Sequence, residues 1–215
     1  MKSCTHLPKI KIYFEIIVLY LLFPLLFLWD VFNFPIMLLL LPVGIGIYLF
    51  LKRDHSFDNK LFINWANGKK YLKPMLVLSL ISAGVMLTIS WMVEPANVFI
   101  LIKERLWLLL IISVFYPLFS VVPQALAYRA LFFHRYAYLF GGKWMQLIVS
   151  ALLFSFGHIL YKNWLVLLLT FVGGLIYSYR YLQSKSLALN VLEHSIYGVW
   201  LFASGLGMFF ISSRV

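Results

Sequence analysis

The chain has 215 residues, of which 63% are hydrophobic and only 12% are charged, with a formal net charge of +11. A soluble domain is roughly half apolar and about a quarter charged, so this composition excludes an ordinary soluble protein and predicts an integral membrane protein. No basic face interleaved with aromatic residues is present, so we expect no nucleic-acid partner. The positive charge instead suits contact with anionic lipid headgroups of a bilayer.

Seven apolar runs follow one another along the chain: 12–29, 35–51, 75–93, 106–133, 144–160, 164–179 and 187–211. A helix needs about 20 mostly apolar residues to cross a bilayer. The fourth run contains Pro117 and Pro123 and is longer than a ~30 Å hydrocarbon core requires. It is either tilted and kinked or holds an extra short segment. We therefore expect an all-α, polytopic transmembrane helix bundle with seven or eight membrane segments, forming a single domain over residues 1–215.

The positive charges predict the orientation of the bundle. Leaving aside Arg129, thirteen Lys and Arg residues fall on one predicted face and four on the other. Because cytoplasmic loops carry an excess of Lys and Arg, we expect a cytoplasmic N-terminus and a C-terminus across the membrane, with the bacterial inner membrane as the location. The first run has no small-residue cleavage site, so it is expected to remain as a span. The single cysteine, Cys4, excludes a disulfide within the chain.

Five polar side chains inside the apolar runs are candidates for a functional site. Gln124 and Arg129 are in the fourth run, His158 is in the fifth, and Glu193 and His194 are in the seventh. Ionisable groups inside a membrane are costly and by default mark functional sites. Each group could instead satisfy a separate hydrogen bond between helices. Because three helices contribute, as in sites built in bundle cores, we expect one shared functional cavity.

Depth within the membrane tests this expectation. Counted at about 1.5 Å per residue from the predicted cytoplasmic ends, Gln124 lies about 15 Å deep, His194 about 12 Å and His158 about 22 Å. A straight parallel bundle would keep these three side chains apart. Tilted helices or a re-entrant loop are needed to bring them together.

Three stretches resemble the motifs of the CPBP family of intramembrane proteases, which includes CAAX prenyl endopeptidases and bacteriocin-processing or immunity proteins. Residues 123–130, with the sequence PQALAYRA, resemble the family's Glu-Glu pair followed by Arg after three residues. Phe154 and His158 match the Phe and His of its second motif, and His194 followed by Gly198 echoes a His-x3-Asn motif. The resemblance covers residues 123–207.

The resemblance implies roles for several residues. In the family, a motif Glu and the first His activate water against a peptide carbonyl, while the last His and its Asn stabilise the oxyanion. Carried over, His158 would be the partner in water activation, His194 the oxyanion donor and Arg129 the cation that orients a Glu. The substrate implied is a membrane-anchored or hydrophobic peptide, or a membrane-proximal protein.

Three positions depart from the family pattern. Gln124 and Ala125 stand in place of the two glutamates, and Gly198 stands in place of the asparagine. General-base catalysis needs a group that takes a proton near neutral pH, and neither an amide nor a methyl group does so. Two explanations stay open: Ala125 is an engineered replacement of a natural Glu, or the chain is naturally inactive or uses Glu193 as a displaced carboxylate.

The sequence thus predicts an intramembrane endopeptidase that is catalytically impaired, with a non-catalytic protein of the same fold, an immunity factor or scaffold, as the alternative. No cofactor is expected. A divalent metal at His158 and His194 is a further possibility, since neutral imidazoles suit zinc. Catalytic zinc, however, usually has three protein ligands, and only Glu193 is available as the third.

Overall fold

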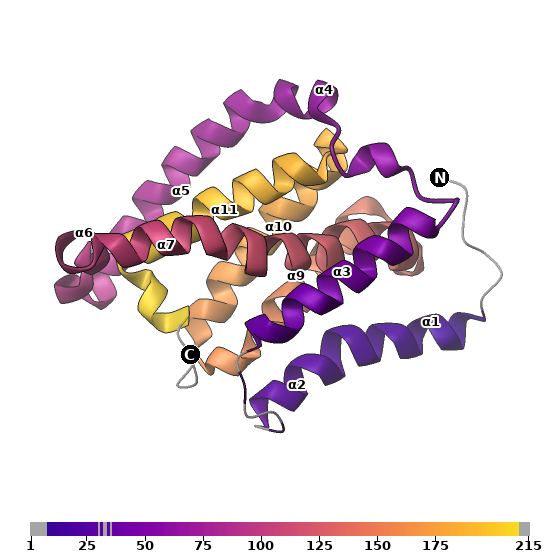
Figure 1. Ribbon diagram of the computed structural model, residues 1–215, viewed down its shortest axis with the longest axis horizontal. Coiled ribbons are helices and arrows are strands. Elements are labelled where there is room, and N and C mark those ends of the chain that lie inside the picture. Colours follow the sequence, from indigo (N-terminus) through magenta and orange to yellow (C-terminus); the bar gives the residue numbers. More distant parts are fainter. Residues whose placement is uncertain (1–7, 30, 32–33, 35, 211–215) are drawn as a thin grey trace.

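The structure is a computed structural model that describes residues 8–29, 31, 34 and 36–210. This part of the chain is helical and contains no strand, which confirms the all-α prediction (Figure 1). Five helices are long and apolar enough to cross a membrane: Lys9–Leu28, Trp65–Val93, Leu106–Phe140, Lys143–Tyr161 and Trp164–Ser184. The chain is therefore an integral membrane protein.

The other two predicted spans also form helices, but neither is among these five. Helix α3 (Met37–Arg53) is only 17 residues long. Helix α11 (Leu187–Ser204) carries Asn190, Glu193 and His194, which lower its apolar character. The expected number of seven or eight membrane segments and the cytoplasmic N-terminus stay predictions.

Several of the long helices are composite. The first joins α1 (Lys9–Ile16), a π-helical turn (Ile17–Leu22) and α2 (Phe23–Leu28). The next spanning helix joins α4 (Trp65–Gly68), a 3-10 turn (Lys69–Tyr71) and α5 (Leu72–Val93). Two short 3-10 turns, Asn59–Leu61 and Pro95–Asn97, and helix α6 (Ile100–Glu104) lie in the connections.

The long fourth run forms one continuous helix of 35 residues rather than two segments. It consists of α7 (Leu106–Tyr116), a π-helical turn (Pro117–Val121), α8 (Val122–Ala125), a second π-helical stretch (Leu126–Tyr136) and a 3-10 turn (Ala137–Phe140). The first π-helical turn begins at Pro117, where the proline ring removes a backbone donor. Wider π turns re-aim the side chains that follow them and are frequent at functional sites.

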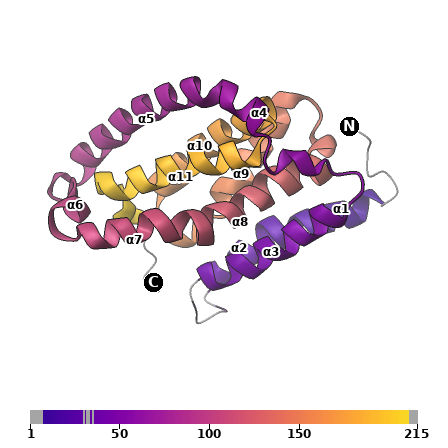
Figure 2. The same ribbon diagram turned by 45° about the horizontal axis from the view of Figure 1, so that its top comes forward.

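Small residues allow close helix packing in the second half of the chain. This half holds α9 (Lys143–Phe156), a 3-10 turn (Ile159–Tyr161), α10 (Trp164–Ser184), α11 and a final 3-10 turn (Leu206–Phe210). A Cβ added at Gly174 of α10 would lie 2.9 Å from the Cα of Ala151 on α9, so the two backbones approach closely. Helix α11 packs against α5, α7 and α10. The composite α1–α2 helix lies at the opposite edge of the bundle from α5 (Figures 1 and 2).

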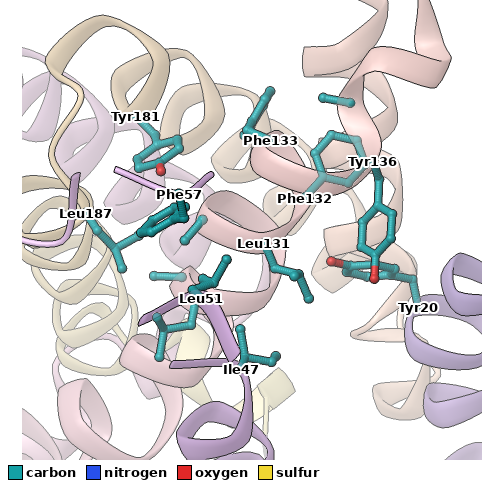
Figure 3. Packing of buried hydrophobic residues seen from close by; sticks show 14 of the residues in the cluster. Tyr20, Ile47, Leu51, Phe57, Leu131, Phe132, Phe133, Tyr136, Tyr181 and Leu187 are labelled. Atoms are coloured by element: carbon teal, nitrogen blue, oxygen red, sulfur yellow. The ribbon is translucent and has the colours of Figure 1, made fainter. Parts of the chain in front are cut away.

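A large apolar core joins the N-terminal helix, α3 and the second half of the fourth run. Tyr20, Leu51, Phe132 and Tyr136 are at most 1% exposed and belong to one cluster (Figure 3). The hydroxyl of Tyr20 donates to the carbonyl oxygen of Ala127 at 2.7 Å, which satisfies its polar end. This cluster fixes the helix that carries Gln124, Ala125 and Arg129.

Candidate functional site

Three of the polar residues expected to form a site line one cavity. Gln124, His158 and His194 come from α8, the turn after α9, and α11, and all three border a cavity of about 960 Å³. This volume lies at the upper end of the range for small-molecule and peptide sites, about 300–1,000 Å³. The tilt and composite form of the helices therefore overcome the difference in depth that a straight bundle would impose.

His158 presents a hydrogen-bond acceptor to this cavity. It lies two residues beyond the end of α9, and its Nδ1 atom is 2.8 Å from the carbonyl oxygen of Phe154. Because a carbonyl only accepts, Nδ1 carries the proton, and Nε2 of the neutral ring keeps its lone pair. The ring also contacts those of Phe154 and Tyr161, at centroid distances of 4.8 and 6.0 Å.

His194 is held by aromatic residues from three other helices. Its ring stacks on Tyr177 of α10 at 4.4 Å and 25°. Its Nε2 atom lies 3.3 Å from the hydroxyl of Tyr116, at the end of α7. The edge of Phe154 contacts this imidazole at 5.5 Å as well, so Phe154 touches both histidines.

Gln124 adds a second acceptor. Its Nε2 atom donates to the hydroxyl of Ser120 at 2.7 Å, one turn earlier in the same helix. Its Oε1 atom is buried and has no partner among the described residues. An unsatisfied buried acceptor costs about 1–3 kcal/mol.

Arg129 lies behind the cavity rather than in it. It is 2% exposed, and its Nη1 atom donates to the carbonyl of Tyr128 at 3.1 Å and to the hydroxyl of Ser150 at 3.4 Å. Its guanidinium lies 4.8 Å from the ring of Phe154 and 5.8 Å from that of Tyr177. One layer of aromatic rings thus separates this cation from the two histidines.

Ala125 does not line the cavity either. It is 2% exposed and packs in the apolar core. Position 125 precedes Arg129 by four residues, so the two positions lie on the same side of the helix.

Glu193 points away from the site. Its side chain is fully buried, and both of its oxygens accept from Nε of Arg180, at 3.1 and 3.3 Å. Neighbouring helical residues point about 100° apart, which is why His194 faces the cavity and Glu193 faces α10. The geometry therefore argues against Glu193 as the displaced base.

Residues 104–200 match the family model for Rce1-like type II CAAX prenyl endopeptidases. The resemblance to the CPBP family is confirmed. The matched region includes all six residues expected at the site: Gln124, Ala125, Arg129, His158, Glu193 and His194. No curated protein and no solved structure matches the chain significantly.

The cavity of this Rce1-like region carries no formal charge. Among the described residues that line it there is no Asp, Glu, Lys or Arg. Nor do the described His, Cys, Asp and Glu residues form a group of three that could hold a metal ion. Among the residues that the structure describes, His158 and His194 thus have no third ligand of these types beside them, whereas catalytic zinc usually has three protein ligands.

Two further residues of the Rce1-like region were not among the predicted site residues. Arg180, which directly follows the predicted apolar run 164–179, lies behind the site, buried in α10 beside Glu193. Tyr116 was not singled out, yet its hydroxyl contacts His194 and its ring lines the cavity. A Cβ atom added at Gly198 would overlap this ring, reaching its Cζ atom at 2.6 Å.

Proposed function

We propose that this chain is a catalytically impaired intramembrane endopeptidase of the CAAX type, which binds a hydrophobic or membrane-anchored peptide. The observation that carries the proposal is the cavity shared by His158, His194 and Gln124, in which no described residue is a carboxylate. Within this protease family such a cavity is suited to a peptide, and without the carboxylate its hydrolysis is impaired.

The missing carboxylate has a calculable effect. A positioned general base typically contributes about 10²–10⁴-fold to a rate. His158 keeps Nε2 as an acceptor, so water still has one polarising partner, but no carboxylate among the described residues lines the cavity beside it. Cleavage by the chain as it stands should therefore be lower than that of a carboxylate-bearing variant by about this factor.

The polar groups of the cavity suit a peptide bond. His158 Nε2 is an acceptor for a peptide N–H, and the pair formed by Tyr116 and His194 supplies the donor for a carbonyl. The remainder of the lining is largely apolar and uncharged, which disfavours charged side chains because they would lose hydration without a partner.

A substrate could enter this cavity from the bilayer. Ile81 and Val85 on α5 and Ile111 on α7 line the cavity and are 60%, 53% and 44% exposed. Such exposed apolar side chains on helices long enough to cross a membrane face lipid. A membrane-anchored peptide therefore has an apolar route to the histidines.

The decisive experiment restores the carboxylates. Gln124→Glu places one in the cavity, and the Gln124→Glu/Ala125→Glu double variant adds a second within reach of Arg129. In proteoliposomes containing a fluorescence-quenched hydrophobic peptide, the double variant should cleave about 10²–10⁴ times faster than the unmodified chain. His158→Ala in the same background should remove the gain.

Two results would contradict the proposal. If the folded double variant cleaves no hydrophobic or membrane-anchored peptide, the endopeptidase assignment fails. If the unmodified chain also binds none of these peptides, the non-catalytic alternative, an immunity factor or scaffold, replaces it. The codon at position 125 of the natural gene separates the two origins of the defect, since a Glu codon means an engineered loss and an Ala codon a natural one.

A further inference from the structure

Tyr116 occupies an unusual place in the fold. It is the last residue of α7, directly before Pro117 and the π-helical turn. Its ring is packed edge-on against Phe202 at 5.8 Å and against His194 at 6.2 Å. These contacts hold the phenol at the cavity wall with its hydroxyl next to Nε2 of His194.

Gly198 makes this position of Tyr116 possible. Positions 194 and 198 are one helical turn apart and lie on the same face of α11. A Cβ atom at position 198 would overlap Cε1, Cζ and the hydroxyl of Tyr116. Any larger residue at 198 therefore excludes the observed phenol, and the phenol fills the space that such a side chain would use.

The pair formed by His194 and Tyr116 can supply a donor for a ligand carbonyl. One N–H of the Gln124 amide already donates to Ser120, and Nδ1 of His158 already donates to Phe154. In the tautomer with its proton on Nε2, His194 donates to the hydroxyl of Tyr116. The phenol proton is then free, and a hydrogen bond received by an O–H group strengthens the one that it donates.

We propose that Tyr116 binds the carbonyl oxygen of the peptide, with its hydroxyl held by His194. His194 then acts as a positioning residue through Tyr116. This inference rests on the proposed function and deepens it, because it assigns the donor that faces the peptide. It also gives the bound peptide a direction, with an N–H group toward His158 and the selected carbonyl toward α7.

The test uses the full chain in nanodiscs and acetyl-trileucine amide carrying one ¹³C-labelled carbonyl. Tyr116→Phe removes the hydroxyl but keeps the ring that packs on Phe202. We expect about tenfold weaker peptide binding, the effect of losing one hydrogen bond, and an upward shift of the ¹³C=O infrared band. Tyr161→Phe is the matched control, because Tyr161 lines the same cavity but contacts His158.

A second variant separates the hydroxyl from the fold. Gly198→Ala leaves the phenol in the chain but displaces it, so the infrared band should move as it does in Tyr116→Phe. Unchanged affinity and an unchanged band in Tyr116→Phe would overturn the inference while peptide binding stands. Absence of peptide binding by the unmodified chain would overturn the proposed function, and the inference with it.

Discussion

The buried ion pair between Arg180 and Glu193 allows a quantitative prediction about stability. Glu193 is 0% and Arg180 6% exposed, and among the described residues Arg180 is the only hydrogen-bond donor to this carboxylate. Arg180→Met keeps much of the side-chain volume but leaves the carboxylate buried without its cation. Removing one partner of a buried pair typically costs about 3–5 kcal/mol, so we expect the free energy of unfolding to fall by this amount.

The double variant Arg180→Met/Glu193→Gln should regain most of that loss. Replacing both partners of a buried pair by uncharged residues is often neutral, so the double variant is expected within about 1–2 kcal/mol of the unmodified chain. The coupling energy is the difference between the double variant and the sum of the two single variants. This coupling energy measures the interaction between the two charged side chains separately from the effect of each substitution on packing.

Unfolding by titration with sodium dodecyl sulfate in mixed micelles, followed by tryptophan fluorescence, measures these differences. The matched control is Arg135→Met, which breaks the more exposed pair with Glu15, at 2.7 Å and with side chains 12% and 23% exposed. We expect about 1 kcal/mol there, because solvent screens such pairs. An equal cost for both substitutions would refute the claim that burial makes the Arg180 pair the more important one.

Three further changes probe other parts of the chain. Burial raises the pKa of Asp54, but hydrogen bonds from Ser56 and His134 outweigh this effect and lower that pKa. Asp54→Asn should therefore lower the free energy of unfolding by under about 1 kcal/mol at pH 7. In denaturant titrations, this difference between the variant and the unmodified chain should shrink as the pH falls below about 4. Gly174→Leu should lower the free energy of unfolding by about 1–3 kcal/mol through overlap with α9, and thermal unfolding equal to that of the unmodified chain would contradict the close approach. Arg129→Met removes a buried cation that pairs with none of the described carboxylates. In denaturant titrations we therefore expect the free energy of unfolding to be unchanged or raised by about 1 kcal/mol. A loss above about 2 kcal/mol would contradict this expectation.

Three polar residues of the cavity could be predicted from sequence because each is a polar exception in an apolar run. Gln124, His158 and His194 stand out in this way, and the structure brings them to one cavity. Straight, parallel helices would have kept these three side chains at different depths in the membrane. In the structure α9 ends at Phe156, before His158, and the helices cross one another (Figure 1).

Arg180 was missed for a simple physical reason. Its apolar run ends at Tyr179, so a count of hydropathy assigned the arginine to a loop. Helix α10 in fact continues to Ser184 and buries Tyr177, Arg180, Tyr181 and Ser184. These four positions follow the i, i+3, i+4, i+7 spacing of one helix face, and this periodicity would have indicated that the arginine is inside.

Tyr116 could not be found in this way. The residues that it meets on α11 are 78 or more positions away in the chain, and nothing in the apolar run 106–133 distinguishes this tyrosine from the other aromatic residues around it. Only the packing of α7 against α11 shows that the glycine at position 198 and this phenol occupy complementary space.

This complementarity bears on the origin of the altered motifs. An engineered Glu-to-Ala change at position 125 would account for Ala125, which sits in the core away from the cavity. It would not account for Gly198, which lies on another helix and whose missing side chain leaves the room that Tyr116 fills. At position 198 the space left by the departure from the family pattern is filled by an aromatic side chain from another helix. Restoring a carboxylate at 125 alone should return less activity than restoring positions 124 and 125 together, because Gln124 lines the cavity and Ala125 does not.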